Sequence, residues 1–323
     1  MVERRKKIEF DVDESKFNKD TMKLYKKYEI GMGLKELSPK TIYGYKSDLY
    51  SWFSYIYLFQ DNKSILEIDE DDLTEFFYYC KQQGNNTRRI KRRMSAISAF
   101  YIFLKKKKIT KENPIEYIDR PKKDNDVIVQ TFLTQEQVDE ILNKLEELPN
   151  KLQVLAFVSL ALSSLARVNA LISCRWEQVN FDECYIEGVI EKEGYVVDLD
   201  FDEYTKNILL KLKKQREGRG IDCEYIFCSL YDGEYKQINN STANDWSKFA
   251  GKLIGIETLH CHDFRHSGAT LLKNAGMSLE DVSKSLNHAG VDVTLKHYIK
   301  QDRSKLREEK RKYGVMKNRT IDK

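Results

Sequence analysis

HDFRHSGATLLKNAGMSLEDVSKSLNHAGVDVTLKHY, residues 262–298, is the stretch that decides the fold. All five histidines of the chain lie within residues 260–297, which random scatter over 323 residues would rarely produce. One site is therefore expected to use several of them. His262 and Arg265 are three residues apart and share one face of a helix, so both can reach the same anionic group. Arginine clamps phosphate through two hydrogen bonds and stays charged in any environment, so this face indicates phosphate chemistry.

The histidine spacing also leaves a metal site as an alternative. His262 and His266 are four residues apart on the expected helix, as two zinc ligands would be. However, Arg265 lies within one turn of both, and a guanidinium beside a dication is electrostatically unfavourable. No suitable third ligand is evident, although Cys261 and His288 could be argued. We therefore expect no metal and no other cofactor.

The composition of the chain indicates a globular protein of two ordinary domains. Of its 323 residues, 33% are charged and 41% are hydrophobic. No run approaches the roughly 18 apolar residues of a membrane span, and the first residues lack the apolar core of a secretory signal. The six cysteines form no C-x-x-C pair, so reduced thiols are the simplest interpretation. We expect a cytoplasmic protein without a membrane partner.

Positive charge is concentrated in the first part of the chain. Residues 1–130 carry 27 Lys and Arg against 21 Asp and Glu, a balance of +6, whereas residues 131–323 carry 28 against 30, a balance of −2. Residues 88–108 contain nine basic residues and no acidic residue. This block is a candidate phosphate-binding face, with a solvated helix surface as the alternative.

Four helices are expected before residue 117, which would make a small all-helical domain. They cover roughly residues 15–29, a segment that starts at Ser38-Pro39, a segment that opens in the acidic turn 69–72, and residues 86–104. In the last of these, an apolar stripe lies opposite a basic face. The residues expected to contact phosphate groups of a partner are Lys40, Lys46, Arg88, Arg89 and Arg92.

The second part of the chain mixes helices with a few strands. A capping box at Thr134-Gln137 begins a helix. Residues 151–166 are almost wholly apolar, which predicts a helix buried on all sides. Residues 184–200 have strand character on both sides of a tight turn at residues 191–194, and helical patterns return from Glu203. The expected fold class is mainly α with a small antiparallel β-sheet.

The motif around His262 resembles the H-x-x-R-H box of the tyrosine recombinases, the phage integrase family. Leu286-Asn-His288, followed ten residues later by Tyr298, is similar to the second half of that signature. The apolar segment before Arg167 resembles the first arginine box of the family, and Lys192 resembles the lysine that the family carries between two strands. The catalytic residues that this resemblance implies are Arg167, Lys192, His262, Arg265, His288 and Tyr298, the last as nucleophile.

Some positions depart from the family pattern. Ser164-Leu165-Ala166 stands where Thr-Gly usually precedes the first arginine, and Ala170 stands where a glutamate usually follows it. Both changes bear on how Arg167 is presented and supported. Asn287 replaces the usual glycine before His288. By the same resemblance, Arg175 is interpreted as structural, and His266 and His297 as packing groups.

The resemblance also implies the domain plan. An N-terminal extension at residues 1–14 would precede a helical core-binding DNA domain at 15–117. A linker at 118–130 would lead to an α+β catalytic domain at 131–312, and a frayed basic tail would cover 313–323. No arm-type DNA-binding domain is expected, so the chain is similar to the simple Cre and Xer recombinases.

The implied function is site-specific DNA recombination, by integration, excision or resolution, through a 3′-phosphotyrosine intermediate. The implied partners are double-stranded DNA and further copies of the chain, assembled as a tetramer on two DNA sites. The abundance of Lys, Ile, Asn and Tyr is compatible with a mobile element of an AT-rich bacterium. Two alternatives remain: a type IB topoisomerase, and a catalytically inactive DNA-binding regulator in which residues 276–286 form a helix-turn-helix.

Overall fold

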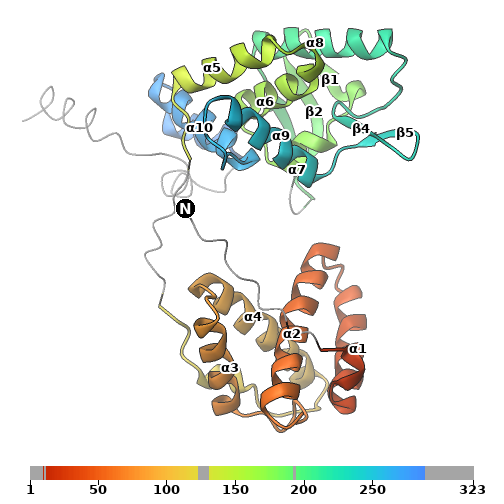
Figure 1. The fold of residues 1–323 in the computed structure, drawn as a ribbon, viewed down its shortest axis with the longest axis vertical. Helices are drawn as coiled ribbons and strands as arrows, with labels where there is room; N and C mark the ends of the chain where they lie inside the picture. Colours follow the sequence, from red (N-terminus) through yellow and green to blue (C-terminus); the bar gives the residue numbers. More distant parts are fainter. Residues whose placement is uncertain (1–9, 11, 123–130, 192–193, 288–323) are drawn as a thin grey trace, which may run out of the picture. The chain divides into compact units, whose positions relative to one another are not determined.

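The computed structural model describes residue 10 and residues 12–122, 131–191 and 194–287. The chain divides into two compact units, Met1–Ile128 and Val129–Lys323 (Figure 1). The division falls within the expected linker at 118–130, of which residues 123–130 lie outside the described part. Helices dominate both units, and the described strands all belong to the second. The predicted fold class, mainly α with a small antiparallel sheet, is confirmed.

The first unit contains the four predicted helices. They are α1 (Lys19–Gly33), α2 (Pro39–Phe59), α3 (Glu70–Gln82) and α4 (Thr87–Lys106), with 3-10 turns at Glu14–Lys16 and Pro114–Tyr117. Their starts are fixed by side-chain caps. The Ser38 hydroxyl accepts a hydrogen bond from the Thr41 amide, and Asp69 forms the capping box of α3.

The core of the first unit is largely aromatic. The apolar stripe of α2 is buried through Trp52 and Phe53, and it packs against Phe100 and Tyr101 of α4. The Tyr101 hydroxyl donates a hydrogen bond of 2.7 Å to the carbonyl of Ile65, which satisfies its buried polar atom. The apolar stripe predicted for residues 86–104 is therefore the face of α4 that the structure buries.

A buried carboxylate, which the sequence analysis missed, connects α2 and α4. Asp48 is fully buried, and Arg92 Nε donates to its Oδ2 at 2.7 Å. Arg89 Nη2 lies 3.3 Å and Arg93 Nε 3.8 Å from Asp48 Oδ1. Arg93 is itself buried and also donates to the Ser51 hydroxyl. The basic face of α4 is thus anchored by a counter-charge from α2.

We expect Asp48→Asn to destabilise the first unit by about 3 kcal/mol, because it leaves the buried Arg93 without its counter-charge. Hydrogen exchange in the full chain measures this effect. Amides of α2 and α4 should exchange faster, while amides of the second unit keep their rates. Glu75→Gln, which removes an exposed charge from α3, is the matched control. Unchanged exchange in α2 would contradict a structural role for Asp48.

In the second unit several helices pack around one apolar helix. The helices are α5 (Gln135–Glu146), α6 (Leu152–Ser164), α7 (Val168–Ser173), α8 (Glu203–Gly218), α9 (Asn240–Leu253), α10 (Cys261–Asn274) and α11 (Leu279–Ser285) within the described residues. The predicted buried helix is α6, which packs against α5, α8, α9 and α10. The predicted capping box of α5 is present at Thr134.

Two small antiparallel sheets complete the described part of this unit. Strands β1 (Val179–Asn180), β2 (Tyr185–Ile190) and β3 (Val196–Asp200) form one sheet in that order. Strands β2 and β3 are the predicted pair around the turn at 191–194. The hairpin of β4 (Cys228–Tyr231) and β5 (Glu234–Gln237) was not predicted. Its Asp232-Gly233 turn has positive φ at both residues, the geometry for which this dipeptide is a known signal.

Candidate active site

Arg167 is presented by a sharp turn between α6 and α7. Helix α6 ends at Ser164, and its C-cap residue Leu165 has a φ of 54° in the left-handed region. Arg167 occupies the N-cap position of α7. This is where the sequence departs from the usual Thr-Gly, and the left-handed backbone favours glycine. Leucine is accommodated because its side chain is buried with Val282 and Leu286 of the α11 segment. That burial offsets the roughly 1–2 kcal/mol conformational cost.

Arg265 is held inside the protein by two backbone carbonyls. Its side chain is 1% exposed, and Nη1 donates to the carbonyl of Leu165 while Nη2 donates to the carbonyl of Leu286, each at 2.6 Å. Helix α10 is fixed at its start by Asp263, whose carboxylate accepts a hydrogen bond from the His260 amide. The guanidinium therefore ties α10 both to the turn before Arg167 and to the end of α11.

A third charged group, Glu191 at the end of β2, lies between the two arginines. Its carboxylate forms an ion pair with Arg167 through Oε2, and its Oε1 lies 4.0 Å from Arg265 Nη1. The side chain is only 3% exposed. The sequence analysis placed Glu191 in the strand turn and gave it no role. An acidic residue at the end of a strand does not by itself predict a contact with two distant arginines.

His262 lies beside these cationic groups. Its ring packs edge-to-face on His266, with ring centroids 4.4 Å apart, and His266 also contacts Phe132. Burial, and then the positive charges of Arg265 and Arg167, lower the pKa of His262 from its usual value of 6.5. His262 is thus neutral at pH 7 and able to accept a proton. His266 is buried, as a packing group would be.

Three of the six expected catalytic residues, Arg167, His262 and Arg265, thus come together. Lys192, His288 and Tyr298 lie outside the described residues, as does the basic tail. In the sequence, Lys192 directly follows Glu191, and His288 is two residues beyond Leu286, whose carbonyl accepts from Arg265. Among the residues that the structure describes, no cluster of three or more His, Cys, Asp or Glu side chains could hold a metal.

Arg175 makes contacts of a structural kind. Its guanidinium lies over the Tyr225 ring, donates to the Tyr225 hydroxyl, and pairs with Glu224. Trp176, the next residue, packs against the core and lies under the guanidinium of Arg216.

The residues expected to contact DNA all belong to α2 and α4 of the first unit. Lys40 and Arg88 are exposed, and Lys46 Nζ lies 5.0 Å from the centroid of the Tyr50 ring. The side chains of Arg89 and Arg92 are 33% and 47% exposed while paired with Asp48. In both arginines the guanidinium group is held at the buried carboxylate while the side chain remains partly exposed.

Comparison with known proteins matches both units to one family. The phage integrase family model matches residues 131–305, and the model of the phage integrase N-terminal SAM-like domain matches residues 32–108. Tyrosine recombinase XerD of Oceanobacillus iheyensis is 27% identical over 265 residues, which cover 80% of this chain and 86% of the relative. Tyrosine recombinase XerC of Pediococcus pentosaceus is 26% identical over 297 residues, covering 86% and 93%.

Solved structures share the fold. A crystal structure of the XerH site-specific recombinase bound to a palindromic difH substrate has a TM-score of 0.68 at 18% identity, covering 84% of this chain and 79% of XerH. The Tn1549 transposon integrase in complex with transposon right-end DNA has a TM-score of 0.67 at 16% identity, covering 91% and 99%.

The fold and the match across both units define a DNA strand-transferring enzyme. The chain belongs to the phage integrase family, the tyrosine recombinases. It is therefore a DNA-binding, site-specific recombinase. Separately, no helix in the described part of the chain is both long and apolar enough to cross a membrane.

The lowered pKa of His262 makes the pH dependence of DNA cleavage a test of its role. If neutral His262 accepts the proton of the nucleophile, protonating it at acid pH stops cleavage. Because its pKa is lowered, the acid limb of the cleavage rate should lie below pH 6.5. Single-turnover cleavage at saturating DNA, measured from about pH 5 to pH 8, gives this limb. If the acid limb of the pH–rate profile is centred above pH 6.5, or if the His262→Asn variant keeps the same limb, His262 is not the base.

Proposed function

We propose that the chain cuts and rejoins duplex DNA through a covalent 3′-phosphotyrosine bond on Tyr298. Arg167 and Arg265 bind the scissile phosphate in this reaction. The observation that carries the proposal is that Arg167, from the turn before α7, lies beside Arg265 and His262 of α10. Nucleophilic attack on a phosphodiester requires cations that stabilise the negative charge on the phosphate and a base that accepts the proton of the nucleophile, and these groups can supply both.

The arginines stabilise the charge that develops on the phosphate. Attack adds negative charge to the non-bridging oxygens, and donors that are already fixed in place lower the barrier most. Arg265 meets this condition because two backbone carbonyls fix its guanidinium. Arg167 has its guanidinium held at the Glu191 carboxylate. His288 completes the set of phosphate donors in this proposal.

The two proton transfers are assigned to different residues. A tyrosine phenol has a reference pKa of about 10, so Tyr298 needs a base, and His262 takes its proton as the Oη–P bond forms. Lys192 gives a proton to the 5′ oxygen as its bond to phosphorus breaks. Attack by a 5′ hydroxyl of a partner strand reverses both steps. The phosphotyrosine bond keeps the energy of the broken linkage, so neither ATP nor a metal is required.

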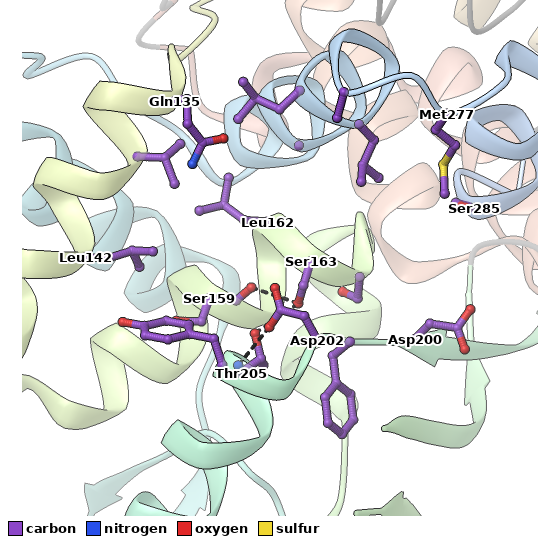
Figure 2. Close-up of a pocket in the computed structure, with 18 of the residues that line it drawn as sticks. Gln135, Leu142, Ser159, Leu162, Ser163, Asp200, Asp202, Thr205, Met277 and Ser285 are labelled. Atoms are coloured by element: carbon purple, nitrogen blue, oxygen red, sulfur yellow. Dashed lines mark hydrogen bonds between the residues drawn. The ribbon is translucent and has the colours of Figure 1, made fainter. Parts of the chain in front are cut away.

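A groove in the second unit supports assembly into a tetramer on two DNA sites. It has a volume of about 1020 Å³, and apolar side chains such as Leu142, Leu162 and Met277 line it (Figure 2). Acidic residues, among them Asp200 and Asp202, lie along it. In the proposed assembly this groove receives the basic segment at residues 300–311 of a neighbouring protomer. The basic residues of that segment are Lys300, Arg303, Lys305, Arg307, Lys310 and Arg311.

The biological setting is also part of the proposal. We place the reaction in the cytoplasm of a bacterium, on the DNA of a mobile element. Integration, excision and dimer resolution all use the same strand exchange.

The alternative functions receive less support. Residues 276–286 were considered as a helix-turn-helix, yet this segment buries Val282 and supplies the Leu286 carbonyl that holds Arg265. That role belongs to a working active site rather than to a DNA-reading motif. A type IB topoisomerase shares the chemistry, but the match of the first unit to the integrase SAM-like domain favours the recombinase.

Tyr298→Phe should abolish covalent attachment to DNA and leave DNA affinity within a few-fold of the unaltered protein. The phenol is required to form the bond to phosphorus but contributes little to docking. A nicked suicide substrate resolved on a denaturing gel detects the covalent adduct. Tyr313→Phe is the control and should form the adduct normally. An adduct with Tyr298→Phe, or its loss with Tyr313→Phe, would assign the nucleophile elsewhere.

Lys40→Ala and Arg88→Ala test the DNA-binding face of the first unit without disturbing Asp48. Each lost phosphate contact should lower the slope of log affinity against log salt concentration by about 0.9. Fluorescence anisotropy with a labelled core site at several salt concentrations gives the slope. Lys81→Ala, on the exposed surface of α3, should leave it unchanged. If neither of the two variants changes the slope, these residues do not face DNA.

A further inference from the structure

We propose that Glu191 is a positioning residue for the recombination reaction: its carboxylate holds Arg167 beside Arg265 so that both guanidinium groups meet one phosphate. This inference rests on the proposed function, in which the two arginines bind the scissile phosphate. Glu191 is not one of the residues that the family signature identified in this sequence.

Arg167 depends on such support more than Arg265 does. The guanidinium of Arg265 is buried and donates to two backbone carbonyls. The Arg167 side chain is 33% exposed, and within the described residues Glu191 is its ion-pair partner. Ala170, three residues after Arg167, stands where a glutamate is usual, and its methyl group cannot accept a hydrogen bond. The acid that supports Arg167 thus comes from the sheet instead of from α7.

The backbone of the β2–β3 connection fixes the position of this carboxylate. The Glu191 amide donates to the carbonyl of Tyr195 at 2.7 Å, and the Glu191 carbonyl accepts from the Gly194 amide at 3.3 Å. Both backbone polar groups of Glu191 are therefore bonded across the turn. A side chain whose own backbone groups are both bonded, and which is itself 3% exposed, is well suited to hold a neighbouring group in one orientation.

The charges at the site explain why a carboxylate is the appropriate support. Two guanidinium groups that converge on one point repel each other when no anion is present, most strongly where burial excludes water. One carboxylate offsets this repulsion but leaves the three groups with a net charge of +1. The site therefore stays attractive to the scissile phosphate, while its donors are already arranged before DNA binds.

The same geometry could give the opposite effect if Glu191 acted as a competitor of the phosphate. A competing carboxylate would have to be displaced by DNA. Removing it would then speed cleavage and tighten binding. The two roles predict changes of opposite sign, so a single measurement separates them.

The test compares Glu191→Gln and Glu191→Ala in the full chain, with Glu187→Ala as the matched control on the exposed side of β2. Single-turnover cleavage of a suicide substrate at saturating DNA should fall about tenfold for Gln and about a hundredfold for Ala, the usual effect of losing a residue that orients a catalytic group. DNA affinity should stay within a few-fold, and Glu187→Ala should cleave normally. Cleavage at or above the unaltered rate in both Glu191 variants would overturn the proposal.

A second substrate separates positioning from a general structural defect. A methylphosphonate at the cleavage site replaces one charged oxygen with a methyl group, so it depends less on Arg167. On this substrate the loss of cleavage rate in the Glu191 variants should be smaller than on the phosphate substrate, and the loss in Arg167→Ala should be smaller to the same degree. An equal deficit on both substrates would mean that Glu191 only maintains the fold.

Two further variants distinguish failure of this inference from failure of the proposed function. If Tyr298→Phe and Arg167→Ala are inactive on the phosphate substrate while the Glu191 variants cleave normally, only the role of Glu191 is wrong. If Tyr298→Phe still forms the adduct, the proposed function is wrong.

Discussion

The buried guanidinium of Arg265 is the interaction on which the site depends. A cation enclosed in protein is costly unless its donors are satisfied, and here two of them reach the carbonyls of Leu165 and Leu286. Those carbonyls are at the end of α6 and just after α11, so one side chain joins three segments that are far apart in the chain. The left-handed turn at Leu165 serves both arginines, because it accepts from Arg265 and places Arg167.

The first unit also depends on a buried charge. There a buried carboxylate, Asp48, gathers three arginines of α4, and Arg93 among them is buried as well. In both units a buried carboxylate, Asp48 or Glu191, pairs with at least one more exposed arginine. A protein that grips a polyanion gains from this arrangement, because rigid donors lose little conformational entropy when the phosphate arrives.

The electrostatics of the second unit also set the state of His262. Burial and two neighbouring arginines disfavour its imidazolium form, so in the proposed reaction the cations that bind the phosphate also keep the base neutral. Phosphate binding and proton acceptance thus depend on the same charges. The position of Glu191 matters for both functions, because it moderates the field that these arginines produce.

Local patterns in the sequence predicted the helices, their caps and the family. Apolar periodicity and capping residues act within a few positions, so α2, α3, α4, α5 and α6 could be predicted, and the spacing from His262 to Tyr298 identified the signature. The sequence also contained a signal that the analysis did not use. Asp48 and Arg93 are opposite charges on the apolar stripes of two helices. Their pairing, the left-handed backbone at Leu165 and the ion pair between Glu191 and Arg167 become apparent only in the folded protein. Each of these depends on contacts between residues distant in the chain, as between Arg265 and Leu165, 100 positions apart, and no local pattern encodes such a contact.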